Sequence, residues 1–293
     1  MTNIGALDLV HLTPLMELSA GNPRVAMGLI DGPVALRHPD LATNHLREIP
    51  GTVSASCTQT GSIACAHGTF VAGVLSAKRG CAAPGICPEV TLLLRPIFAE
   101  SQPIDAQMPS ATPTELAAAI TDCVDAGVRA INLSAGLIQS SKGELKLEAA
   151  LDYCLKRNVI IVAASGNHGG IGSSSITRHH CVIPVVGYDM SKRPMNEANT
   201  GRSIGLRGIG APGRGITSLG TTTKTLTLSG TSAAAPFVTG VIALLWSIFP
   251  EATTTELRAV LRQSVSARRY TLMPPLMDAW AAYKLMLTSR GKR

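Results

Sequence analysis

Aromatic side chains are scarce in this chain of 293 residues, where Phe, Tyr and Trp together make up 3%. Binding of single-stranded nucleic acid depends on aromatic rings that stack on the bases, so we expect no nucleic-acid partner. Charged residues are also few, at 15%, and although Lys and Arg outnumber Asp and Glu by 26 to 19, no run of basic residues exceeds two. Hydrophobic residues make up 45%, which is enough for a sizeable core and excludes a disordered chain.

The amino-terminal segment lacks the features of a targeting or membrane-spanning sequence. Residues 1–24 contain no basic n-region and no apolar stretch long enough for a signal sequence or a bilayer span. We therefore expect a cytoplasmic protein that has no membrane partner.

Cysteine usage does not fit a small disulfide-stapled secreted domain, because seven cysteines, an odd number, are scattered through a mid-sized chain. Most of them are expected to be buried thiols. One local pair, Cys81 and Cys87, flanks a short loop. The sequence leaves open whether these two residues form a disulfide.

Short β-branched runs alternate along the chain with stretches of helical periodicity. The predicted strands are 24–30, 90–94, 128–133, 159–163 and 182–186. The predicted helices are 114–126, 143–157 and 237–246. This alternation predicts an α/β fold with a mostly parallel sheet covered on both faces. No linker-like, repeated or low-complexity tract interrupts it, so we expect one domain over residues 1–293, with a core at about 20–265 followed by a helical extension and a frayed tail.

Four polar residues stand where predicted strands end or predicted helices begin. Asp31 and Asn167 each follow a predicted strand, whereas His67 and Ser232 each stand near the start of a helix. Separations of 36, 100 and 65 residues divide the four along the chain. Because parallel strands deliver their loops to one edge of the sheet, we expect these side chains to meet at that edge.

These residue types together suit nucleophilic catalysis. A serine hydroxyl is a weak nucleophile until a histidine accepts its proton, and the histidine needs a carboxylate to fix its tautomer. Ser232, His67 and Asp31 supply these three roles. The helix start at Ser232 places backbone N–H groups beside a developing oxyanion, and Asn167 adds a side-chain donor. Each residue alone is typical of a turn, cap or loop, so it is their joint occurrence that favours catalysis.

Four sequence blocks resemble those of the subtilisin-type serine proteases: IDGP, HGTFVAG, ASGN and GTSAAAPFVTG. The resemblance covers residues from about 20 to 265 and shares the family's chain order of Asp, His and Ser. It implies a three-layer subtilisin-like fold with a mostly parallel central sheet. It also implies a catalytic triad and an oxyanion hole that share the serine: Asp31, His67 and Ser232 for the triad, Asn167 and Ser232 for the hole.

The same resemblance implies where substrate binds and what reaction follows. Ser134, Ala135 and Gly136 stand where the family's substrate-pairing strand lies, so we expect them to pair with an extended peptide. No G-x-S-x-G surrounds Ser232, which argues against an α/β-hydrolase. The implied activity is that of a serine endopeptidase that works through an acyl-enzyme, needs no cofactor and takes a peptide as its partner.

Shorter stretches resemble the proteases that trim ribosomally made peptide precursors in cyanobactin-like pathways: DGPV, GICP and PIF. Those enzymes remove a leader segment. The gap between Asp31 and His67 is too short for the helical lid of macrocyclising relatives, and the short segment before Asp31 leaves no room for a signal peptide plus propeptide. We therefore expect intracellular precursor processing by hydrolysis. General intracellular proteolysis and an inactive protease-fold binding module remain alternative interpretations.

Metal ligands are not expected. The loop 78–84, where subtilases often hold calcium, has two cations and no acid. Two sets of residues could be considered for zinc, but neither has the paired C-x-x-C spacing: His179, His180 and Cys181, or Cys57, Cys65 and His67. Among the basic residues of the last third, Arg178 is the candidate for attracting an acidic leader peptide.

Overall fold

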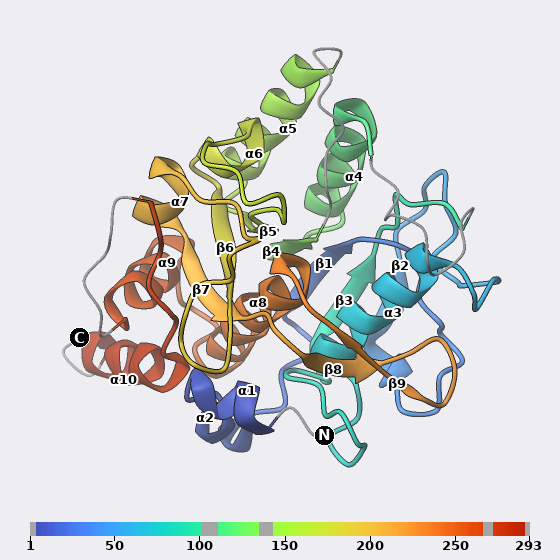
Figure 1. The fold of residues 1–293 in the computed structure, drawn as a ribbon, viewed down its shortest axis with the longest axis horizontal. Helices are drawn as coiled ribbons and strands as arrows, with labels where there is room; N and C mark the ends of the chain where they lie inside the picture. The colour runs from blue at the N-terminus through green and yellow to red at the C-terminus, as the bar shows by residue number, and fades with distance from the viewer. Residues whose placement is uncertain (1–3, 101–110, 135–142, 266–271, 291–293) are drawn as a thin grey trace.

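The computed structural model describes residues 4–100, 111–134, 143–265 and 272–290 (Figure 1). Its centre is a seven-stranded sheet in the order β2–β3–β1–β4–β5–β6–β7, in which every neighbouring pair is parallel. The strands are β1 (Ala26–Ile30), β2 (Leu46–Glu48), β3 (Thr91–Leu94), β4 (Ala130–Leu133), β5 (Ile160–Ala164), β6 (Val182–Tyr188) and β7 (Ile209–Pro212). A separate antiparallel hairpin consists of β8 (Ile216–Leu219) and β9 (Thr225–Leu228).

Helices cover both faces of the sheet and complete a three-layer α/β fold (Figure 1). The helices are α1 (Ile4–Leu9), α2 (Thr13–Leu18), α3 (Ile63–Ser76), α4 (Pro113–Asp125), α5 (Glu144–Lys156), α6 (Ser175–Arg178), α7 (Arg202–Arg207), α8 (Thr231–Ile248), α9 (Thr254–Gln263) and α10 (Ala279–Arg290), with a 3₁₀ turn η1 (Thr43–His45). Alternating side chains of each strand serve the two layers. In β5, Ile160 and Val162 pack with α3 and α8, whereas Ile161 and Ala163 pack with α4 and α5. The predicted fold class is confirmed.

The predicted elements agree closely with the observed ones. All five predicted strands are present, each with ends within two residues of the prediction, and two of the predicted helices correspond to α4 and α5 with ends shifted by one residue. The third corresponds to α8, which begins six residues earlier than predicted, at Thr231. Strands β2, β7, β8 and β9 were not predicted.

Helix α8 is the core of the larger helical layer. It is long and apolar enough to cross a membrane by length and composition, yet 83% of that window is buried inside the protein. Its side chains pack against β4, β5, β6 and β7 and against α3. Its apolarity is therefore accounted for by the hydrophobic core.

The helices near the two ends of the described chain pack together, with α10 beside α2 (Figure 1). Helix α10 packs on α9 and α2. The backbone N–H of Ala279 donates to the carbonyl oxygen of Val10 at 2.9 Å, and His11 Nδ1 lies 3.0 Å from Asp278 Oδ2. The helical extension predicted after residue 265 thus folds back on the amino-terminal helices. Ser289 and Arg290, the first two residues of the predicted frayed tail, belong to α10, and residues 291–293 lie outside the described residues.

The disulfide candidate from the sequence is wrong. Cys81 and Cys87 are free thiols, and the disulfide joins Cys57 to Cys65. The loop that contains Cys57 is held beside α3 because the backbone N–H of Cys57 donates to the carbonyl oxygen of Val34 at 2.9 Å. The partner thiols meet through this tertiary contact, which local spacing does not reveal.

Helix α3 lies unusually close to the loop that follows β1. A Cβ added to Gly68 would collide with the carbonyl oxygens of Gly32 and Pro33, and one added to Gly32 would collide with the carbonyl oxygen of Ala64. Glycine at both positions therefore allows backbone to approach backbone.

We predict that Gly68→Ala lowers the free energy of unfolding by about 1–3 kcal/mol, because the added methyl group must push α3 away from the loop after β1. Urea denaturation measures the loss. Gly61→Ala is the matched control, since a Cβ at Gly61 meets nothing within 4 Å, and it should change stability by less than about 1 kcal/mol. Equal stability of the Gly68 and Gly61 variants would contradict the close approach.

Candidate active site

Three neighbouring strands bring polar residues to one edge of the sheet. Strands β1, β4 and β5 are adjacent. Asp31 directly follows β1, Ser134 directly follows β4, and Asn167 lies three residues beyond β5. Since all three strands are parallel, these residues leave the sheet at the same carboxyl edge, as predicted.

Asp31 and His67 form a buried hydrogen-bonded pair. His67 Nδ1 lies 2.7 Å from Asp31 Oδ1. The same oxygen accepts the backbone N–H of Gly32 at 2.7 Å. Asp31 is 0% exposed and His67 7% exposed, so little water screens the pair. The carboxylate fixes the proton on Nδ1 and leaves Nε2 as the basic atom of the ring.

Two opposing effects set the pKa of His67. Burial lowers the pKa, while the charge of Asp31 and the hydrogen bond to it raise it, and the net result is a pKa above the ordinary 6.5. The charged form of His67 is therefore stabilised by Asp31. Such a histidine suits a base that must become an imidazolium during a reaction.

Ser232 is the second residue of α8, at the end of the helix where backbone N–H groups are free. Its carbonyl oxygen accepts a hydrogen bond from Ser134 Oγ at 3.3 Å. Within the described part of the chain the Ser232 hydroxyl makes no hydrogen bond, to His67 or to any other residue. Hydrogen bonds between nucleophile and base often tighten only when substrate binds.

Asn167 is tied to the start of α8 by its side-chain oxygen. Asn167 Oδ1 accepts the backbone N–H of Thr231 at 2.9 Å, and Thr231 Oγ1 in turn accepts the N–H of Gly166 at 3.2 Å. Gly230 adopts φ +147°, and a Cβ there would come within 3.0 Å of Asn167 Nδ2. Because Oδ1 is engaged with Thr231, the amide Nδ2 is the group of Asn167 that remains to donate to a ligand.

A proline inside α8 explains why Ser134 can reach Ser232. Pro236 has no N–H, so the carbonyl oxygen of Ser232 four residues earlier lacks its helical donor. Ser134 Oγ supplies the missing hydrogen bond. Asn132 Nδ2 donates to Ser134 Oγ at 2.9 Å, and Asn132 Oδ1 accepts from Thr239 Oγ1 at 2.8 Å. A buried polar network thus joins β4 to the first three turns of α8.

Sequence reasoning missed Asn132 and Thr239 as members of this site. A signal was present, because Asn132 is the only amide in the apolar strand β4 and Pro236 interrupts an otherwise regular helix. Of the predicted substrate-pairing residues, Ser134 lies at the site, while Ala135 and Gly136 lie outside the described residues. Pairing of this segment with a peptide stays a prediction.

The residues of the two sets considered for zinc make contacts with other side chains. Cys57 and Cys65 lie near Glu100, and their sulfur atoms are joined to each other. His67 Nδ1 is engaged with Asp31. In the other set, His179 Nδ1 lies 3.1 Å from Cys181 Sγ, whereas His180 Nδ1 faces Arg207.

Arg79 anchors the loop 78–84 to neighbouring backbone. Arg79 donates to the carbonyl oxygens of Met16, Ser19 and Ile86, at 2.8, 3.0 and 2.6 Å. Its guanidinium thus occupies oxygens of the kind that calcium would use. The expectation that no metal binds here stays a prediction.

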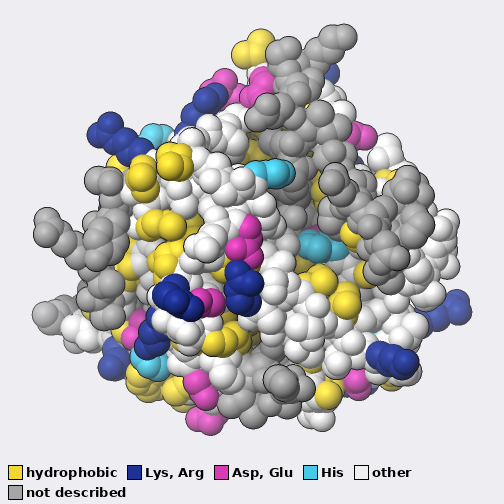
Figure 2. All heavy atoms as spheres, in the orientation of Figure 1, with side chains coloured by type: hydrophobic (Ala, Val, Ile, Leu, Met, Phe, Trp, Pro, Cys, Tyr) yellow, Lys and Arg dark blue, Asp and Glu magenta, His cyan; other side chains and the backbone are white. Residues whose placement is uncertain are grey.

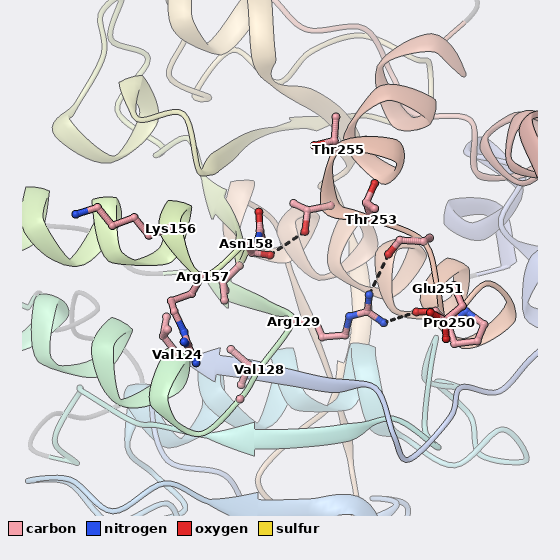
Figure 3. Close-up of a pocket in the computed structure, with 14 residues that line it drawn as sticks. Val124, Val128, Arg129, Lys156, Arg157, Asn158, Pro250, Glu251, Thr253 and Thr255 are labelled. Atoms are coloured by element: carbon pink, nitrogen blue, oxygen red, sulfur yellow. Dashed lines mark hydrogen bonds between the residues drawn. The ribbon is translucent and has the colours of Figure 1, made fainter.

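A pocket of about 810 Å³ lies at the opposite edge of the sheet, where the chain enters β4 and β5 (Figure 3). Arg129 crosses it and donates to the carbonyl oxygens of Pro250 and Ala252 at 2.9 and 3.0 Å. None of the predicted site residues lines this pocket. It is therefore separate from the candidate active site.

The comparisons with known proteins identify the family of this chain. A model of the subtilase family matches residues 23–278. The chain belongs to the subtilase family. Subtilisin DY of Bacillus licheniformis is 27% identical over 239 residues, which cover 80% of this chain and 81% of that protein.

Solved structures of maturation proteases are similar over nearly the whole chain. The protease domain of PatA, in a variant form, is 29% identical with a TM-score of 0.82, and the alignment covers 92% of this subtilase and 97% of that chain. The prenylagaramide maturation protease PagA is 26% identical with a TM-score of 0.80, covering 94% and 98%. The protein is therefore a subtilisin-like serine endopeptidase, and the fold implied by the sequence is confirmed.

We predict that Asn167→Asp lowers kcat by about 10²–10³-fold, the loss known for removal of one oxyanion donor from a subtilisin, with little change in KM. The aspartate keeps an oxygen for the Thr231 N–H but removes the Nδ2 donor. Asn167→Ala removes both groups, so it should also lower the melting temperature through loss of about 1 kcal/mol at the helix start. Unchanged kcat per folded molecule in Asn167→Asp would exclude the oxyanion role.

We predict that the acid limb of the profile of kcat/KM against pH lies above pH 6.5, because His67 must be neutral to accept a proton and Asp31 raises its pKa. In Asp31→Asn the raising charge is gone and burial still lowers the pKa, so the limb should move to lower pH. The rate should also fall by about 10⁴-fold, as for the equivalent change in a known serine-protease triad. If the acid limb of the Asp31→Asn profile stays at the same pH, Asp31 does not set the pKa of His67.

Proposed function

We propose that this subtilase removes a leader segment from a ribosomally made peptide precursor, with Ser232 as nucleophile and His67 as base. The support for the chemistry is the buried Asp31–His67 pair at the sheet edge from which Ser134 and Asn167 reach the start of α8. The support for the substrate class is the similarity to the patellamide maturation protease PatA and to PagA, each above 25% identity over more than nine-tenths of the chain.

The first half of the reaction forms the acyl-enzyme. His67 Nε2 accepts the proton of the Ser232 hydroxyl as Oγ attacks the carbonyl carbon of the scissile bond. Asp31 stabilises the imidazolium that results. The backbone N–H of Ser232 and the Asn167 Nδ2 amide donate to the oxyanion. The C–N bond then breaks, and His67 returns the proton to the leaving amine.

The second half of the reaction releases the leader. Water gives a proton to His67 Nε2 and attacks the ester carbonyl, and the bond to Ser232 Oγ breaks as that oxygen takes the proton back. Asn167 again faces the negative oxygen. Because the anchoring of Asn167 by Thr231 is present before substrate binds, the donor needs no reorganisation during either step.

Recognition of the precursor is proposed to use its extended backbone. A peptide that pairs with the segment beginning at Ser134 would lie as an added strand, so several residues before the cut would be read by alternate side-chain pockets. Arg178 is exposed at the end of α6, four residues before β6 begins, which places it towards the amino edge of the sheet. Its proposed attraction for an acidic leader would therefore act at a distance from the triad.

Charge on the face shown in Figure 2 gives no reason to favour another partner class. Lys and Arg side chains lie scattered over this face together with acidic ones, and no single basic patch covers it. The basic side chains visible on this face are thus dispersed. We retain a peptide as the proposed partner.

A cytoplasmic location is a separate proposal. It has no support from the Cys57–Cys65 disulfide, because such bonds are more frequent in oxidising compartments. Fractionation of the producing cells, followed by detection of the protein in the soluble cytosolic or the exported fraction, decides the matter.

We predict that the enzyme cuts a leader-containing precursor at one site, and that its kcat/KM on a peptide spanning this site exceeds that on a dipeptide ester by more than about 10²-fold, because remote contacts contribute only with the longer chain. Mass spectrometry of the products locates the cut. Degradation of unrelated proteins at many sites would instead support general proteolysis. Ser232→Ala is the control and should abolish turnover while retaining the fold.

Labelling with a serine-directed fluorophosphonate separates a failure of the chemistry from a failure of the substrate assignment. If Ser232 is labelled but no precursor is cleaved, the proposed substrate is wrong and the proposed chemistry still holds. Absence of label in the folded protein, with Ser232→Ala as the blank, would support the inactive binding module instead.

A further inference from the structure

A cluster of cysteine, histidine and carboxylate side chains lies at the edge of the sheet opposite the triad. Cys181 directly precedes β6 and so stands at the amino edge of the parallel sheet. His179 is the residue that caps α6, and α5 contributes Asp152 and Cys154. Peptide hydrolysis as described above uses none of these four residues.

The histidine of this cluster has the geometry of a base directed at the thiol. His179 Nδ1 lies 3.1 Å from Cys181 Sγ, and His179 Nε2 lies 3.1 Å from Asp152 Oδ1. The backbone N–H of Cys181 donates to the same Nδ1 at 3.2 Å. Because Nδ1 accepts this bond, the ring carries its proton on Nε2, where Asp152 accepts it. The ring therefore presents a lone pair to the thiol of Cys181.

A second thiol and a cation complete the surroundings of Cys181. The Cys154 thiol hydrogen-bonds to Cys181, and this bond is the largest cause that holds the pKa of Cys181 below its usual range. Burial acts in the opposite direction, while the contact with His179 and the positive charge of Arg258 add to the lowering. The guanidinium of Arg258 also donates to the carbonyl oxygen of Cys181.

The chain contains two internal controls for this environment. Cys87 and Cys123 are each 0% exposed, against 1% for Cys181. Burial raises the pKa of Cys87 and of Cys123 to about 12. Within the described residues, neither thiol has a hydrogen bond to a histidine. A difference in reactivity between Cys181 and these two thiols would therefore report on the partners of Cys181 and not on exposure.

We propose that Cys181 and Cys154 form a second reactive centre of the protein, a dithiol that hydrogen peroxide oxidises to a disulfide. Cys181 gives its proton to His179 Nδ1, and its sulfur attacks one peroxide oxygen. The O–O bond breaks, a sulfenic acid forms on Cys181, and the departing hydroxide takes the proton to leave as water. The Cys154 thiol attacks the sulfenic sulfur, and a second water leaves as the S–S bond forms. The two thiols lose two electrons, which reduce peroxide to two waters.

The probe must be small enough to reach the nearly buried sulfur of Cys181. Cys181 is nearly buried, but the side chain of His179 is 13% exposed and that of Asp152 57% exposed, so the proton path leads to solvent. Hydrogen peroxide is close to water in size, whereas alkylating reagents are larger. The probe is therefore dilute hydrogen peroxide applied to the folded full chain, followed by denaturing alkylation and mass spectrometry of the cysteine peptides.

We predict that the cross-linked Cys154–Cys181 peptide accumulates while Cys87 and Cys123 remain alkylatable thiols. Asp152→Asn, at an exposed position, should slow the oxidation, and His179→Ala should slow it by about tenfold or more, because one pKa unit changes the thiolate fraction tenfold. In Cys154→Ala the reaction should stop at the sulfenic acid, which dimedone traps on Cys181. Cleavage activity, measured in parallel, verifies that each variant is folded, since the cluster lies away from the triad.

Three outcomes would overturn the proposal. Oxidation of Cys87 or Cys123 as fast as that of Cys181 would show that the partners confer no reactivity. An unchanged rate in both folded variants, Asp152→Asn and His179→Ala, would exclude His179 as the base. Oxidation of Cys181 without formation of the Cys154–Cys181 peptide would remove Cys154 from the centre.

Discussion

The hydrogen bond between Asp31 and His67 is the contact around which the rest of the molecule is arranged. It holds a carboxylate with no solvent exposure, and the other carboxylate oxygen has no partner among the described residues. A buried charge of this kind is costly unless its few partners are well placed. The close approach of α3 to the loop after β1, which glycine permits at Gly32 and Gly68, is what places them.

The nucleophile side of the site relies on an interrupted helix. Helix α8 packs regularly in the apolar core, but Pro236 has no N–H to donate to the carbonyl oxygen of Ser232. This oxygen accepts a hydrogen bond from Ser134 Oγ instead. The defect in the helix thereby becomes a link to β4. Asn167 makes a second link, through Thr231, from β5. The start of α8 is thus positioned by two neighbouring strands rather than by its own backbone bonds alone.

Sequence patterns predicted the parts of this structure that local chemistry determines. The five predicted strands are short apolar runs rich in β-branched residues, which a sequence pattern reveals. Asp31, His67, Asn167 and Ser232 lie in ordered family blocks, so they too could be predicted. Strand β2 has three residues and β9 carries threonines on alternate positions, which leaves no apolar run to detect. The sequence pointed to Cys81 and Cys87 as a candidate pair and left their bonding open, whereas Cys57 meets Cys65 through a tertiary arrangement that includes a backbone contact with Val34. The Asn132–Thr239 link, which spans 107 residues, depends on packing in the same way.

The position of α8 late in the chain has a consequence for biosynthesis. The central strands, the histidine helix and Asn167 all emerge from the ribosome before the helix that fills the larger core. Until residues 231–248 are made, β4, β5 and β6 lack their main apolar cover, and exposed apolar surface of this kind favours aggregation. The helix that follows every strand of the sheet along the chain is also the one that carries the serine. A chain whose synthesis has not reached residues 231–248 therefore contains His67 and Asn167 but lacks the nucleophile.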